Sequence, residues 1–183
     1  MRFPFVKMHG TRNDFIVLDT RERSLGDLAG FARRACDRHS GIGADGVLAI
    51  ESSAVADAKM RVINADGGEA EMCGNGIRCV ARYLVESGAS NLLRIETIGG
   101  IHSCETIVAS GDWSVRVAIG EVTIERRALP FPDASAVVVG NPHVVLFADR
   151  LDAFDLREAQ ELLTREAGYV DGVNVHLAVV ERD

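Results

Sequence analysis

A predicted helix that begins directly after a cysteine constrains this chain more than any other feature. From Ile77 onward, apolar residues recur at steps of three and four, as on one face of an α-helix, and Gly88 supplies a stop. The residues before it read Cys73-Gly74-Asn75-Gly76. The first N–H groups of a helix have no partner within it, and glycine lets a ligand come close to them. The stretch therefore predicts an anion-binding site beside a thiol that the helix end would stabilise as a thiolate.

A purely structural role fits the same residues and has to be weighed against this chemistry. A cysteine near a helix start is most often a small buried apolar residue, and Gly-Asn-Gly is a common turn. Cys79 falls among the apolar positions of the helix and is predicted to lie in the core. Six helical residues separate it from Cys73 by roughly 9 Å, which is too far for a disulfide.

Composition limits the class of protein and its partners. The 183 residues are 47% hydrophobic and 26% charged, as in a globular protein, and the formal net charge is -7. An acidic surface argues against a nucleic-acid or anionic-membrane partner. The N-terminus lacks the apolar core of a signal peptide, no stretch is long enough to span a bilayer, and the four cysteines have no paired spacing. These features predict a cytoplasmic protein with reduced cysteines.

No cofactor site is predicted. The sequence has no Cys-x-x-Cys, His-x-x-x-His or EF-hand pattern, so it offers no metal site. Gly41-Ile-Gly-Ala-Asp-Gly46 matches G-x-G-x-x-G, but it follows a predicted helix and precedes a predicted strand. This order is the reverse of that in a dinucleotide-binding motif, so the match is rejected.

Short strands around two helices predict an α+β class with a mainly antiparallel sheet. The first part, residues 1–119, has predicted strands at 3–7, 15–19, 47–51, 60–64, 92–97, 101–109 and 113–119 and helices at about 25–39 and 77–88. Asn13 and Asp14 are expected in the loop between the first two strands. A charged, proline-containing linker at 121–132 opens the second part, residues 120–183, with strands at 136–140, 143–148 and 173–180 and a helix near 155–167.

Five motifs together resemble diaminopimelate epimerase in their order and spacing. They are Lys7-Met-His-Gly with Asn13-Asp14-Phe15, Asp37-Arg-His with Gly41-Ile-Gly-Ala-Asp-Gly46, Asn64-Ala-Asp-Gly67, Met72-Cys-Gly-Asn-Gly76 and Gly140-Asn-Pro-His143. The resemblance covers essentially the whole chain. It implies two similar domains, each a mostly antiparallel sheet wrapped around a central helix, with residues 120–183 forming an incomplete second copy.

The resemblance also implies a cofactor-independent isomerase that interconverts LL- and meso-diaminopimelate in lysine and peptidoglycan biosynthesis. Cys73 is then one of two proton-transfer groups, and His143 pairs with it and favours its thiolate. Gly74 and Asn75 hold the reacting carboxylate. The remaining substrate contacts implied are Asn13, Asn64, Asn141 and Asn174. The small-molecule substrate is the expected partner, and a homodimer is left open.

The sequence departs from the family in one respect, which is the motif of the second cysteine. The family's second cysteine, in Cys-Gly-Thr/Ser-Gly, and the Glu-Arg-Gly before it have no counterpart here, and Glu181-Arg182-Asp183 comes too soon after Asn174 to be assigned. We therefore expect the 183 residues to be inactive alone, with apolar faces at 137–139, 144–147 and 162–163 uncovered and prone to associate. A related pyridoxal-independent amino-acid racemase and a non-catalytic substrate-binding fragment are the alternatives.

Overall fold

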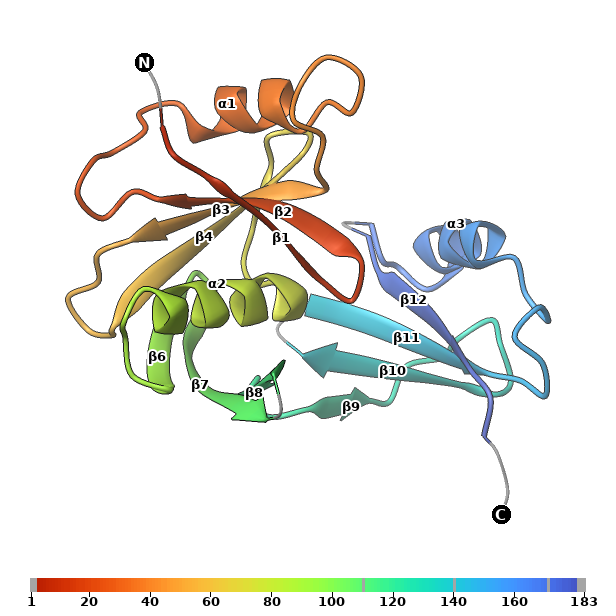
Figure 1. Cartoon of the computed structure of the whole chain (residues 1–183). Helices are drawn as coiled ribbons and strands as arrows, with labels where there is room; N and C mark the ends of the chain where they lie inside the picture. Colours follow the sequence, from red (N-terminus) through yellow and green to blue (C-terminus); the bar gives the residue numbers. More distant parts are fainter. Residues whose placement is uncertain (1–2, 110, 140, 171, 181–183) are drawn as a thin grey trace. The chain divides into compact units, whose positions relative to one another are not determined.

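The chain divides into two compact units, Met1–Ile119 and Gly120–Asp183, each with its own sheet and core (Figure 1). The computed structural model describes residues 3–109, 111–139, 141–170 and 172–180. Gly140 of the Gly-Asn-Pro-His motif and Glu181 lie outside the described residues. Within those ranges, no helix is long and apolar enough to cross a membrane.

The first unit is one curled sheet with two helices. Its strands are β1 (Val6–Gly10), β2 (Asn13–Asp19), β3 (Gly46–Glu51), β4 (Ala58–Asn64), β5 (Glu69–Ala70), β6 (Leu92–Thr97), β7 (Gly100–Ala109) and β8 (Asp112–Val117), and its helices are α1 (Leu28–Ala35) and α2 (Gly74–Glu86). The sheet order is β1-β2-β3-β4-β6-β7-β8, and β5 pairs with β4. The β2–β3 and β4–β6 pairs are parallel and the others antiparallel, which confirms the predicted α+β class with a mostly antiparallel sheet.

Helix α2 is the centre of this unit. It contacts strands from β1 through to β8, so the sheet wraps around it (Figure 1). The positions predicted from the helical spacing are buried, with Ile77, Val80 and Ala81 at 0% exposure. Full burial of a side chain of the size of Val or Ile stabilises the folded state by about 1.5–3 kcal/mol. The opposite face of β2, β3 and β4 packs on α1, so this part of the sheet is buried on both sides.

The hairpin between β1 and β2 differs from the prediction. β1 runs to Gly10, and Asn13 and Asp14, which were expected in a loop, are the first residues of β2. Only Thr11 and Arg12 form the turn, with φ values of 54° and 69°. A tight two-residue hairpin requires positive φ at both positions, and Asn-Gly is its usual signal. Thr-Arg lacks this signal, so the sequence suggested a longer loop.

The second unit is a four-stranded sheet with one helix. Its elements are β9 (Thr123–Glu125), β10 (Ala134–Val139), β11 (Asn141–Phe147), α3 (Leu156–Glu166) and β12 (Asn174–Ala178). The order is β12-β11-β10-β9, with β11 and β12 parallel. The Asp155 carboxylate caps α3 by accepting hydrogen bonds from the amides of Arg157 at 2.8 Å and Glu158 at 3.2 Å.

Three expectations for this unit were wrong. The predicted linker contains a strand, β9, which pairs with β10. Asn141 and Pro142, which were expected to form a turn, begin β11. The expectation of uncovered apolar faces was wrong for Val144, Leu146 and Leu163, which are fully buried because α3 packs on this face of the sheet. It holds for Phe147, which is 40% exposed, and residues 137–139 are half-buried.

Candidate active site

Cys73 is the residue that caps α2. Its backbone is extended, with φ -138° and ψ 109°, and its side chain turns back toward the helix. The amide of Gly76 donates a hydrogen bond to Cys73 Sγ at 3.3 Å. A side chain at Gly76 would meet the Leu48 side chain at 2.9 Å, so glycine is needed for this close approach. The predicted position of the thiol at the helix N-terminus is therefore confirmed.

The Asn13 side chain reaches the same sulfur from the neighbouring hairpin. Its Oδ1 lies 3.8 Å from Cys73 Sγ and accepts from the thiol. Its Nδ2 donates to Asp45 Oδ2 at 2.8 Å. The thiol thus lies between a donor, the Gly76 amide, and an acceptor, the Asn13 oxygen.

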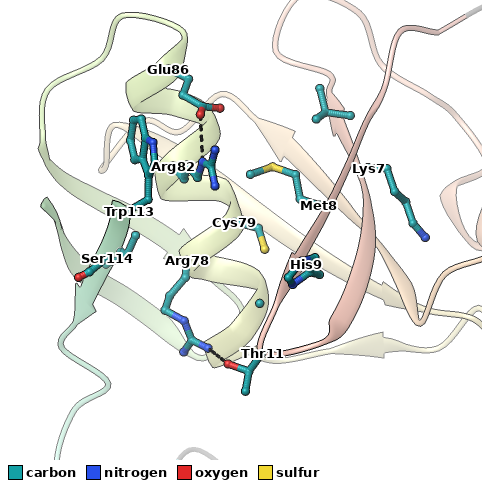
Figure 2. Close-up of a pocket in the computed structure, with 13 residues that line it drawn as sticks. Lys7, Met8, His9, Thr11, Arg78, Cys79, Arg82, Glu86, Trp113 and Ser114 are labelled. Carbon is teal, nitrogen blue, oxygen red and sulfur yellow. Dashed lines mark hydrogen bonds and ion pairs between the residues drawn. The ribbon is translucent and has the colours of Figure 1, made fainter. Parts of the chain in front are cut away.

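The tip of the β1–β2 hairpin is fixed against the first turn of α2. A side chain at Gly10 would lie 2.7 Å from the carbonyl oxygen of Asn75, so the hairpin backbone packs directly on the helix. Arg78 donates a hydrogen bond to the carbonyl of Gly74 at 3.0 Å. It donates another to Thr11 Oγ1, also at 3.0 Å (Figure 2). These contacts hold the strained turn and place Asn13 beside Cys73.

The space over the start of α2 is open at Gly74. A side chain built there meets no atom within 4 Å. The amide of Ile77 donates to the carbonyl of Cys73 at 2.9 Å, and that of Gly76 to its sulfur. The two amides that precede them, at Gly74 and Asn75, belong to the helix end whose N–H groups the helix itself leaves without partners. An anion can approach them without displacing a side chain at Gly74.

Asn64 lies at the same end of the sheet. It is the last residue of β4 and is paired with Gly46, which is paired in turn with Phe15 of β2. The amide of Ala65 donates to the carbonyl of Asp45 at 3.2 Å. The first unit therefore brings Asn13, Asn64 and Cys73 to one end of its sheet, although they are far apart in sequence.

The predicted residues of the second unit, Asn141, His143 and Asn174, lie on β11 and β12. His143 is paired with Asn174 across the parallel strands. His143 and Val145 alternate with the buried Val144 and Leu146, so they face away from α3. His143 Nε2 lies 2.9 Å from Asn141 Oδ1. The side-chain Nδ2 of Asn174 donates a hydrogen bond to the backbone carbonyl of Pro142 at 3.4 Å.

His176 is a partner of this group that sequence reasoning missed. Its Nε2 lies 2.9 Å from His143 Nδ1, and the two rings stack with centroids 5.2 Å apart. Burial, and then the neighbouring His176, lower the pKa of His143. With the Asn141 oxygen facing the ring, as assigned, Nε2 of His143 is the donor to it and Nδ1 is left to accept from His176. The sequence could have revealed His176, because it follows Asn174 by two residues and residues two apart lie on the same face of a strand.

A separate hollow of about 820 Å³ runs along the side of α2, between β1 and β8 (Figure 2). Its lining includes Lys7, His9, Arg82 and Trp113, and the Arg82 guanidinium lies 4.9 Å from the Trp113 ring centroid. Cys73 is not among the lining residues. Within the described ranges, no group of three or more His, Cys, Asp or Glu side chains is arranged to hold a metal ion.

The environments of the four cysteines lead to a prediction of reactivity. Cys73 is half-buried, whereas Cys36, Cys79 and Cys104 are buried. Burial raises the pKa of Cys36, and it raises the pKa of Cys79 and of Cys104 to about 11. A thiol with a pKa of about 11 is roughly one part in a thousand thiolate at pH 8. We expect iodoacetamide at pH 8 to label Cys73 first, as measured by peptide mapping, and faster labelling of Cys104 or Cys36 would contradict this.

Comparison with known proteins identifies the family. The sequence profile described as Diaminopimelate epimerase matches residues 5–125. The diaminopimelate epimerases of Pelotomaculum thermopropionicum and Archaeoglobus fulgidus are each 38% identical to this chain, over 199 and 205 residues. The alignments cover 96% and 100% of this chain and 71% of each relative. The chain belongs to the diaminopimelate epimerase family.

Two solved structures have a fold similar to that of this chain. The PhzF-family phenazine biosynthesis protein of Bacillus anthracis superposes with a TM-score of 0.73 at 19% identity, covering 100% of this chain and 68% of that protein. A predicted epimerase from Pseudomonas aeruginosa gives a TM-score of 0.68 at 12% identity, covering 96% and 70%. At these identities the likeness concerns the fold. The enzyme class, isomerase, follows from the family.

Proposed function

We propose that this chain carries one of the two proton-transfer groups of a diaminopimelate epimerase, and that this group is Cys73. The reaction is the interconversion of LL- and meso-diaminopimelate, which serves lysine and peptidoglycan biosynthesis, and no pyridoxal cofactor takes part. The observation that carries the proposal is the placement of the Cys73 thiol at the N-terminus of α2, beside the open approach at Gly74.

The chemistry explains why a helix end suits this reaction. Removal of the proton next to a carboxylate leaves negative charge on the α-carbon and on the carboxylate oxygens. Without a pyridoxal ring to spread that charge, fixed donors have to stabilise it. The amides of Gly74 and Asn75 are oriented donors at the positive end of the α2 dipole, and we assign the reacting carboxylate to them.

The surroundings of Cys73 suit a group that works as a base in one direction and as an acid in the other. The Gly76 amide favours the thiolate by donating to Sγ, and the Asn13 oxygen favours the thiol by accepting its proton. Neither form is left without a hydrogen bond. Inversion further needs a second group on the opposite face of the α-carbon.

Five further residues are assigned by their place in the family's motifs. Asn13, Asn64, Asn141 and Asn174 would contact the substrate, and His143 would pair with Cys73 and favour its thiolate. In the second unit, Asn141 and His176 each contact one ring nitrogen of His143, so pairing with Cys73 requires one of these two contacts to open. Substrate contact by these side chains is part of the proposal.

Deuterium wash-in from D₂O tests the function. The protein expressed from its intact gene is incubated with LL- or meso-diaminopimelate, and both isomers are followed by NMR, with L-proline as the control substrate. We expect diaminopimelate to exchange and interconvert and L-proline not to. Residues 1–183 alone should not interconvert the isomers. Inversion needs two proton-transfer groups, and Cys73 is the one that we assign within these residues. Sustained interconversion by these residues would contradict the two-cysteine mechanism, and faster exchange of proline would favour an amino-acid racemase.

A further inference from the structure

Asp45 is joined to the Cys73 thiol through a single side chain. Its Oδ2 accepts a hydrogen bond from Asn13 Nδ2 at 2.8 Å, and Asn13 Oδ1 lies 3.8 Å from Cys73 Sγ. We infer that Asp45 is a positioning residue, which fixes the Asn13 amide with its oxygen toward Cys73, where that oxygen can accept a hydrogen bond from the thiol. The inference deepens the proposed function and rests on it, since it concerns the group assigned there to proton transfer.

The orientation of the Asn13 amide follows from the chemistry of its neighbour. An asparagine side chain can turn by 180° and exchange its NH₂ and its oxygen. An ionised carboxylate only accepts hydrogen bonds, so it requires the NH₂ end of the amide. With the NH₂ held at Asp45, the oxygen faces Cys73, where it accepts from S–H and repels a thiolate. If the amide were free to turn, its NH₂ could donate to the sulfur and favour the thiolate.

Asp45 is itself held in place from two directions. Its Oδ2 also accepts from the backbone amide of Asp14 at 3.0 Å, and its Oδ1 accepts from Arg38 Nη2 at 2.8 Å. Arg38 donates at 2.7 Å to Asp14, whose other partner is Lys7. The pKa of Asp14 lies well below its usual range, chiefly because of Arg38. These charges lie partly in solvent, so their contribution is the geometry that they impose.

The test is a double-mutant cycle between Asp45 and Asn13, with alkylation of Cys73 by iodoacetamide as the readout between pH 6 and 10. We expect Asp45→Ala to move the pH profile toward lower pH and to raise the rate at pH 7 by about 2- to 10-fold, as for one lost hydrogen bond. Asn13→Ala should act similarly. In the Asn13→Ala background, Asp45→Ala should add only the smaller effect of its charge. The charged or titratable groups bonded to Asp45 or to the β1–β2 hairpin that carries Asn13, or lying on that hairpin, include Lys7, His9, Asp14, Arg38 and Arg78.

Two further variants separate hydrogen bonding from charge. Asp45→Asn removes the charge but leaves an oxygen that can accept from Asn13, so the profile should stay close to that of the parent. Asp14→Ala removes a neighbouring charge and leaves the Asn13–Asp45 bond, so its effect should be the same with and without Asn13. An Asp45→Ala effect that persists in full in the Asn13→Ala background would overturn the inference, as would an Asp45→Asn profile equal to that of Asp45→Ala.

A measurement on the parent protein covers the case in which Asp45→Ala does not fold. The side-chain NH₂ of Asn13, assigned in a ¹H–¹⁵N spectrum by its loss in Asn13→Ala, should show one proton shifted downfield and protected from exchange. Two side-chain NH protons that both exchange freely and show the shifts of a solvent-exposed asparagine would refute the inference. Because alkylation and NMR need no turnover, failure of the inference can be told apart from failure of the proposed function, which the deuterium experiment reports.

Discussion

Replacement of Cys73 by serine should lower α-proton exchange of diaminopimelate by about 10²- to 10⁴-fold in the protein expressed from its intact gene. Serine is a strong N-cap and can accept the Gly76 amide as the sulfur does, so α2 should keep its start. A hydroxyl, however, does not ionise near neutral pH and is a poor base. The change therefore removes the proton-transfer group and retains the helix that carries it.

Cys79→Ala is the matched control for this prediction. Cys79 lies on the same helix, six residues further on, and is buried in the core around α2. Its loss should cost some stability, through a small cavity, and leave the exchange rate per folded molecule within about twofold. Thermal unfolding and deuterium wash-in are measured on both variants. A Cys73→Ser protein that exchanges as fast as Cys79→Ala would remove Cys73 from the mechanism.

The sequence predicted α2 and its thiol because both depend on local signals. The apolar spacing from Ile77, the stop at Gly88 and the Cys-Gly-Asn-Gly start lie within one short segment, and the structure confirms the helix at Gly74–Glu86. The i, i+4 spacing of Arg82 and Glu86 is also a local signal, and the ion pair forms at 2.9 Å. Short-range periodicity therefore located the element around which the first sheet curls.

The partners of the thiol could not be predicted, because they depend on pairings between distant segments. Asn13 reaches Cys73 only because the β1–β2 turn has two residues, which Thr-Arg does not signal. Asp45 lies in the rejected G-x-G-x-x-G segment, and the parallel pairing of β2 with β3 brings it beside Asn13. The sequence argued only against a dinucleotide site there, and nothing local showed that the aspartate would orient an amide.

The approach to the helix end should be closed by a single branched side chain at Gly74. A Cβ added at Gly74 meets no atom within 4 Å beyond its chain neighbours and the backbone of α2 itself, so the fold should tolerate Gly74→Val. The same space is the proposed path of the substrate carboxylate to the amides of Gly74 and Asn75. Two hydrogen bonds to a charged ligand contribute about 3–6 kcal/mol, so we expect diaminopimelate to bind at least about 100-fold more weakly. Isothermal titration of the protein expressed from its intact gene measures this.

Two further variants calibrate the expected loss of affinity: Gly26→Val is the control, and Asn75→Ala should have an intermediate effect. Gly26 also has no atom within 4 Å of its built side chain and lies before α1, so valine there should leave binding unchanged. Asn75→Ala keeps its backbone amide and loses only side-chain hydrogen bonding, which should cost about 1–2 kcal/mol. The order of affinities should therefore run from the parent and Gly26→Val, through Asn75→Ala, to Gly74→Val. Binding by Gly74→Val at the parent's affinity would mean that the carboxylate does not reach the helix through Gly74, and the anion site at the start of α2 would have to be abandoned.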